Sequence, residues 1–185
     1  MNKTIVDQLY HEFKELVSYL DQEGQISFHD VANKNFTKVL LLAAASYFED
    51  RLAKKLIQFI KTTTRENELL VEFCKNKAIS RQYHTYFDWD KKNANRFFSL
   101  FGDSFKKWME KGIKDDDELA TSIQAFIEIG GERNRLVHQD FGTFTLEKTT
   151  EEIYQLYKNA LYFIEVLPEK LEQFPTVFKP DVGKP

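Results

Sequence analysis

Apolar residues recur at helical spacing along most of this chain. In the first stretch, from about Thr4 to Glu23, they fall on one helix face: Val6, Leu9, Tyr10, Phe13, Leu16, Val17 and Leu20. No segment alternates apolar and polar residues for long enough to require a strand, and only seven Gly and four Pro residues interrupt the pattern. The pattern therefore predicts an all-α fold.

A second helix is predicted from about Asp30 or Lys34 to Lys61. Within it, residues 39–45 form a nearly continuous run of small or apolar side chains, which is typical of the central and most buried helix of a bundle. The chain also holds 17 Phe and 8 Tyr residues, and we expect most of these rings to fill the core between helices.

Capping patterns mark shorter helices in the middle of the chain. Thr63 and Glu66 have the spacing of a capping box, which predicts a short helix through about Lys77. The aromatic-rich segment that follows has the pattern of short helices joined by turns. Asn93 and Asp103 are the candidate caps of these helices.

An acidic run at residues 115–118 predicts the start of a long helix, because negative charge complements the positive end of the helix dipole. We expect this helix to pass Gly130 and Gly131 and to end near Gly142. Each glycine costs about 1 kcal/mol relative to alanine inside a helix. The adjacent pair therefore indicates that another segment approaches the backbone closely.

Thr149 and Glu152 form a second candidate capping box. It predicts a last helix through Leu167. Proline lacks the backbone N–H that a helix interior needs, so we expect Pro168 to kink or end this helix.

Length and composition fit one helical domain over residues 1–174, followed by a Pro-rich tail over residues 175–185. The net charge of −3 and the pI of about 5.9 argue against nucleic-acid binding by bulk attraction, so such binding would need a local cationic cleft. Cys74 is the single cysteine, which excludes a disulfide framework or a cysteine-rich metal site within one chain. The four histidines lack metal-ligand spacing, so we expect no metal ion or other cofactor.

Membrane association is not indicated by the sequence. No run reaches the roughly 18 apolar residues that a membrane span needs, and the first residues lack the apolar stretch of a signal peptide. We therefore expect a soluble cytoplasmic protein with no membrane partner.

The chemistry-bearing motif is the run 132–138, near the end of the predicted long helix. Asn134 and His138 are four positions apart, so they share a helix face, and Arg133 is close enough for all three side chains to converge on one phosphate-sized anion. Arg, Asn directly after it, and His four positions later would occur by chance roughly 0.006 times in a chain of this composition. The grouping suits phosphodiester chemistry without a metal ion.

The Arg133-Asn134-x-x-x-His138 pattern resembles the signature of the HEPN superfamily. Residues 40–52, residues 95–102 and the final helix extend this resemblance to the RiboL-PSP-HEPN branch. The resemblance implies an α-helical bundle that forms a two-fold dimer, with the two motifs facing a shared cleft. It also implies a metal-independent endoribonuclease of toxin or antiphage-defence type, with RNA as substrate and an antitoxin or defence protein as a possible partner.

Under this resemblance, Arg133 and His138 are catalytic and Asn134 orients or assists them. RNA supplies its own nucleophile, the 2′-hydroxyl, so cleavage needs a base, an acid and a cation for the charged phosphorane. One histidine serves one of the two proton-transfer roles at a time, and a dimer would bring a second His138. The expected products carry 2′,3′-cyclic phosphate and 5′-hydroxyl ends.

Other interpretations of the same residues remain open. Glu49 and Asp50 lie in the apolar central helix, and each must find a partner or face a cleft because an unpaired buried charge is costly. Arg133 could form a structural ion pair with Glu49, and Asn134 could bond the backbone near the glycine pair. His84 is interpreted as a packed or surface histidine.

A different class of function is also open. The bundle could be a non-catalytic module that binds a protein partner or RNA, in which the motif holds the dimer. A nucleotide-binding subunit is less well supported, because the sequence holds no Gly-rich phosphate loop.

Overall fold

The computed structural model describes residues 3–175, and these residues form helices and connecting loops without a strand. The predicted all-α fold is confirmed. The elements are α1 (Ile5–Gln22), α2 (Ile26–Thr63), α3 (Glu68–Cys74), the π-helical turn η1 (Lys75–Ile79), α4 (Tyr83–Tyr86), α5 (Asn95–Ser99), α6 (Asp103–Lys114), α7 (Asp117–Val137) and α8 (Thr150–Gln173). Ten of the eleven residues of the predicted tail lie outside the described residues.

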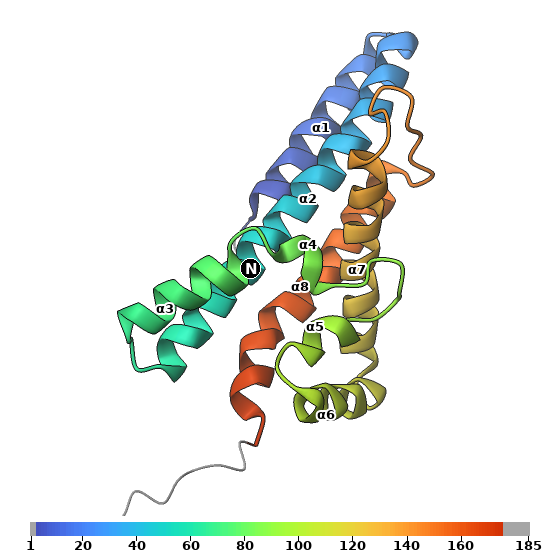
Figure 1. Cartoon of the computed structure of the whole chain (residues 1–185). Coiled ribbons are helices and arrows are strands. Elements are labelled where there is room, and N and C mark those ends of the chain that lie inside the picture. Colours follow the sequence, from blue (N-terminus) through green and yellow to red (C-terminus); the bar gives the residue numbers. More distant parts are fainter. Residues whose placement is uncertain (1–2, 176–185) are drawn as a thin grey trace, which may run out of the picture.

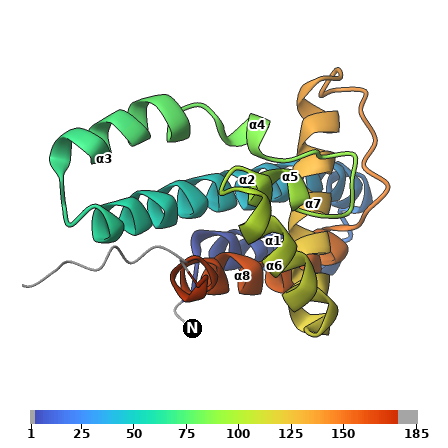
Figure 2. The same cartoon turned by 60° about the horizontal axis from the view of Figure 1, so that its bottom comes forward.

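The long helix α2 runs through the whole molecule. Its first half pairs with α1 in a helical hairpin, its middle packs on α7 and α8, and its last turns carry α3 and η1 (Figure 1). Figure 2 shows α3 and the end of α2 projecting together from the rest of the bundle. The helices α7 and α8 pack along each other, and the short helices α5 and α6 lie beside α7.

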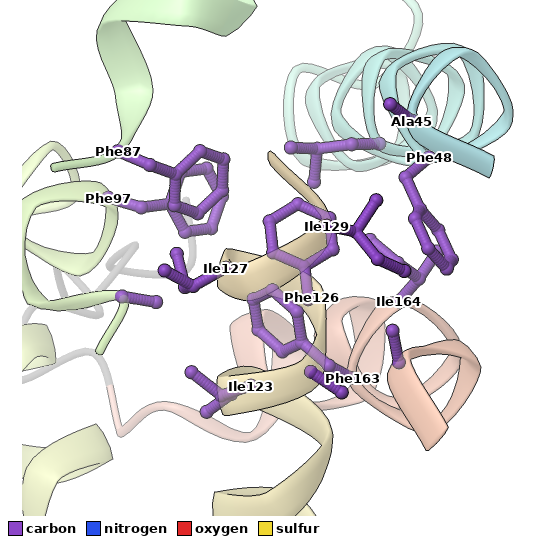
Figure 3. Close-up of a cluster of buried hydrophobic side chains, with 14 of the residues drawn as sticks. Ala45, Phe48, Phe87, Phe97, Ile123, Phe126, Ile127, Ile129, Phe163 and Ile164 are labelled. Carbon is purple, nitrogen blue, oxygen red and sulfur yellow. The ribbon is translucent and has the colours of Figure 1, made fainter. Parts of the chain in front are cut away.

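The core is built from aromatic and branched side chains of α2, α7 and α8, together with the aromatic-rich segment between η1 and α6. Phe126 of α7 is 1% exposed and contacts the rings of Phe48, Phe87 and Phe163 at centroid distances of 5.0 to 5.5 Å. Figure 3 shows these rings meeting around α7. The helix that ends in the motif is therefore held by the centre of the core.

Several helix boundaries differ from the sequence predictions. Helix α2 begins at Ile26 rather than at Asp30 or Lys34, because Gly24 adopts a left-handed φ of 65° and reverses the chain within three residues. Helix α7 ends at Val137 rather than near Gly142. The next residues form a turn in which the Asp140 carboxylate accepts the N–H of Gly142 at 2.8 Å.

Of the two predicted capping boxes, one is present and the other is absent. The capping box of Thr149 and Glu152 is present at the start of α8. The one proposed for Thr63 and Glu66 is wrong, because α2 continues through Thr63 and Glu66 adopts a left-handed φ of 59°. Asn67 caps α3 instead, and its side chain accepts the N–H of Leu70 at 3.1 Å.

Two further caps and one helix end need correction. Asp103 is the first residue of α6, and Gly102 stands at the cap position. Asn93 precedes the cap position of α5, although its side chain accepts the N–H of Asn95 at 3.1 Å. Helix α8 does not end at Pro168 but continues to Gln173, because packing of the buried Leu167 and Leu171 outweighs one missing backbone hydrogen bond.

A buried carboxylate ties α1 to α8. Asp7 forms a capping box with Thr4, accepts the hydroxyl of Tyr154 at 2.7 Å, and lies 3.4 Å from the ammonium group of Lys158. Burial alone would raise the pKa of Asp7, but the hydrogen bonds from Tyr154 and Thr4 and the charge of Lys158 outweigh it and lower the pKa to about 2.

We expect this carboxylate to make stability depend on pH in the acid range. Because its pKa is lower in the folded protein than the ordinary 3.8, its contribution is complete above pH 4 and is lost as the pH falls toward 2. The shift corresponds to about 2 kcal/mol. Urea unfolding of Asp7→Asn should show a loss of about that size at pH 7 and a weaker dependence between pH 4 and 2, whereas the exposed Glu15→Gln on the same helix should match wild type.

Candidate functional site

The motif residues meet at one pocket at the C-terminal end of α7. Arg133, Asn134 and His138 line a hollow of about 570 Å³ together with Val137. The other wall consists of Glu49 of α2, Arg81 before α4, and Tyr83 and His84 of α4. We call this hollow the motif pocket.

Helical geometry places the three side chains together. Leu136 points into the core with 1% exposure and fixes the rotation of the last turn of α7. The backbone N–H of His138 donates to the carbonyl of Asn134 at 3.1 Å, so the helical spacing extends through His138 even though the helix ends at Val137. As the sequence predicts, Asn134 and His138 therefore share one face.

Arg133 and Asn134 are joined through their side chains. The Nη1 atom of Arg133 donates to the Oδ1 atom of Asn134 at 3.1 Å. This bond replaces the interpretation in which Asn134 bonds the backbone near the glycine pair. It holds the guanidinium group against the motif helix and leaves its other N–H groups available for an anion.

The two carboxylates of the central helix have different surroundings. Asp50 forms an exposed ion pair with Lys54 at 2.7 Å, one turn along α2. Glu49 faces the motif pocket, and among the described residues it forms no ion pair with Arg133 within 4.0 Å. The structural Arg133–Glu49 pair considered from the sequence is therefore absent, and Glu49 is the carboxylate that faces a cleft.

Tyr83 lines the motif pocket and packs on an aromatic cluster. Its ring packs on Trp89, Phe87 and Phe126 at centroid distances of 5.5, 6.0 and 6.4 Å. Burial raises the pKa of Tyr83 above its usual range, the Glu49 carboxylate adds to this rise, and Arg133 opposes it. Its hydroxyl therefore stays protonated at neutral pH and can act as a hydrogen-bond donor.

Trp89 fastens the pocket wall to α7. A Cβ atom at Gly130 would lie 1.9 Å from the Cζ3 atom of Trp89, and one at Gly131 would lie 3.1 Å from the Trp89 carbonyl oxygen. The close approach predicted from the glycine pair is therefore present. The indole Nε1 donates to the carbonyl of His84 at 3.1 Å, which connects the segment before α5 to α4.

The charge of the motif pocket is opposite to that of the whole chain. Arg81 and Arg133 supply two guanidinium groups, against the single carboxylate of Glu49. Arg81 is exposed and adopts a left-handed φ of 62°, a conformation that non-glycine residues seldom take and that is frequent at functional sites. A local cationic cleft of the kind that an acidic chain would need for binding phosphates is therefore present.

A second hollow of about 560 Å³ adjoins the motif pocket and shares His84 and Asn134 with it. Its basic side chains are Lys91, Lys92, Arg96 and Arg135. Two of them are neutralised locally, Lys91 by Asp88 at 3.2 Å and Arg135 by Glu132 at 2.9 Å. Arg135 is exposed to solvent and takes part in this ion pair.

The loop after the motif is anchored from α2. Lys38 is 2% exposed, and its ammonium group donates to the carbonyl of Phe141 at 2.5 Å and lies 4.8 Å from the centre of the Phe141 ring. Phe144, 6% exposed, adds an apolar anchor. The chain that follows His138 is therefore held against α2 (Figure 1).

Sequence reasoning missed part of this pocket. Arg81 and Tyr83 were not identified, and His84, interpreted as a packed or surface residue, is exposed and also lines both hollows. No spacing rule connects this segment to a motif fifty residues later. The sequence signal that points to this wall is the glycine pair. It indicates that another segment packs closely on the helix, but it does not show which segment.

The pocket combines groups that suit reactions at a phosphodiester. Guanidinium groups can bind and stabilise a phosphate that gains charge, and an imidazole can accept or donate a proton near neutral pH. Within residues 3–175, no group of three or more histidine, cysteine or carboxylate side chains is placed to hold a metal ion. In the same range, no helix is both long enough and apolar enough to span a membrane.

Comparison with known families matches the RiboL-PSP-HEPN model over residues 7–173. This range includes every helix from α2 to α8 and most of α1, together with the whole motif pocket. Comparisons with curated proteins and with solved structures gave no significant match.

Proposed function

Because this chain belongs to the RiboL-PSP-HEPN family, we propose that it is a metal-independent endoribonuclease. HEPN domains are often ribonucleases, and they often bind RNA and form dimers. The observation that carries the proposal is the convergence of Arg133, Asn134 and His138 on one pocket whose guanidinium groups outnumber its carboxylates.

The reaction would use the nucleophile of the RNA itself. One imidazole accepts the proton of the 2′-hydroxyl while the 2′-oxygen forms a bond to phosphorus, and a protonated group donates to the 5′-oxygen as its bond to phosphorus breaks. Arg133, held by Asn134, binds the phosphoryl oxygens where negative charge accumulates. The products carry a 2′,3′-cyclic phosphate and a 5′-hydroxyl.

A two-fold dimer would complete a shared cleft with a second copy of the motif. Two apolar side chains flank His138 and are each 45% exposed, Val137 and Phe141. A second subunit that covers them would gain apolar burial and bring its own Arg133 and His138 to the same RNA. We infer that the two motif pockets of such a dimer face each other.

The biological setting that fits this chemistry is a toxin or an antiphage-defence nuclease acting on cytoplasmic RNA. Such a nuclease endangers its own host, so an antitoxin or another defence protein is the expected partner. The support for this setting is the family membership and the proposed chemistry.

Cleavage of RNA in the presence of EDTA tests the proposal. Purified full-length protein should cleave total tRNA or an unstructured oligonucleotide and leave 2′,3′-cyclic phosphate and 5′-hydroxyl ends. A single 2′-deoxy substitution at the mapped cleavage site should abolish cutting there, because it removes the nucleophile. Intact RNA after incubation with a well-folded dimer would instead favour the non-catalytic module that binds RNA or a protein partner.

A further inference from the structure

His84 is a second histidine of the motif pocket. Among the described residues that line this pocket, the imidazoles are those of His84 and His138. They come from different elements, since His84 belongs to α4 and His138 follows α7. Both residues are exposed to solvent, so a substrate can reach them.

The backbone beneath His84 is fixed relative to the motif. Its carbonyl accepts the indole N–H of Trp89 at 3.1 Å, and the Trp89 ring lies against Gly130 on α7. Gly130 is one helical turn before Arg133, so this chain of contacts connects the two histidine-bearing segments. Among the described residues, the hydrogen bond of His84 to Trp89 uses its backbone carbonyl, and the ring of His84 has no side-chain hydrogen-bond partner.

His84 also stands where the two hollows meet. Together with Asn134, it lines both the motif pocket and the adjoining hollow. An RNA strand that occupied both hollows would therefore contact His84 and Asn134.

We infer that His84 is a catalytic residue, the second proton-transfer group of the reaction, and this inference rests on the proposed ribonuclease function. One of the two imidazoles takes the proton from the 2′-hydroxyl as the 2′-oxygen bonds to phosphorus. The other, protonated, gives its proton to the 5′-oxygen as the phosphorus–oxygen bond breaks.

Charged groups face His84 from several elements. In the motif pocket they are Glu49 of α2, Arg81, and Arg133 and His138 of the α7 end. In the adjoining hollow, the basic groups are Lys91, Lys92, Arg96 and Arg135. The acidic groups there are Asp88, Asp90, Glu128 and Glu132. A substitution at any of these charged groups would itself change the dependence of kcat on pH. The test therefore substitutes histidines alone.

Kinetics of His84→Ala and His84→Gln, with His11→Ala as the matched control, test the inference. We expect both His84 variants to lower kcat at least about a hundredfold with little change in KM, as loss of a general acid or base does. We expect kcat of the wild type to depend on pH as a bell-shaped curve. In the His84 variants, one of the two limbs of this curve should be absent. His84 variants that fold normally but keep wild-type kcat and both limbs would overturn the inference while leaving the ribonuclease function intact.

A binding measurement decides the inference without relying on turnover. A DNA oligonucleotide of the same sequence lacks the 2′-hydroxyl and cannot be cleaved by this route, but it carries the same phosphates. The imidazole NMR signals of both His84 and His138 should shift when this oligonucleotide is added, and the signal of His11 should not. A shift of His138 alone would overturn the inference even if no RNA were cleaved.

Discussion

His138→Ala is expected to slow RNA cleavage by about 10³- to 10⁴-fold in EDTA-containing buffer. The imidazole is the one proton-transfer group within the motif itself, and it lies in the same pocket as Arg133 and Asn134. Removing it leaves the phosphate-binding groups in place. The loss should therefore fall on kcat, whereas KM for the RNA should change little.

The fold should tolerate this substitution. His138 is exposed at the end of α7, and the bond that it makes to Asn134 uses its backbone N–H rather than its side chain. His138→Ala should keep the helical circular dichroism spectrum and the oligomeric state of wild type, and His11→Ala should keep full activity. Cleavage within tenfold of wild type by His138→Ala would contradict the catalytic role and point to a contaminating nuclease.

The same variant separates an enzyme from a binding module in cells. If the protein acts by cleaving RNA, expression of His138→Ala should lose the growth inhibition that wild type causes, although it accumulates to the same level. A variant that retains the full cellular effect without cleaving RNA would identify a non-catalytic interaction module instead.

Fold class and motif were predictable from the sequence because both depend on short-range spacing. Apolar residues three and four positions apart define a helix face, and the same geometry places Asn134 and His138 together. The capping box of Thr149 and Glu152 is likewise a local pattern, and it is present. The glycine pair at 130 and 131 predicted a close neighbour, which is Trp89.

The opposite wall of the pocket depends on tertiary contacts that no local pattern encodes. Arg81 and His84 reach the motif because Tyr83 and Trp89 pack on α7, about fifty residues further along the chain. The misplaced helix ends have a related cause. Core packing carries α8 past Pro168, and an Asp140 turn ends α7 soon after His138, so tertiary and turn interactions override the local signal.

Gly130→Ala tests how the pocket wall is attached to the motif helix. A Cβ at this position would lie 1.9, 2.2 and 2.7 Å from three atoms of the Trp89 ring, so the indole must move. That ring is held by Phe87, Tyr83 and Phe126 at centroid distances of 4.9, 5.5 and 6.2 Å, which makes the movement costly. We expect a loss of about 3 kcal/mol in the free energy of unfolding.

Gly112→Ala is the matched control, because it is also inside a helix but its Cβ would meet no atom within 4 Å. That variant should gain up to about 1 kcal/mol from higher helix propensity, so the two alanine substitutions should have opposite signs in urea unfolding. Cleavage by Gly130→Ala should also fall under conditions in which the protein stays folded, because displacing Trp89 releases the carbonyl of His84. Equal stability of the two variants would show that the contact of Trp89 with Gly130 does not hold the wall of the motif pocket against α7.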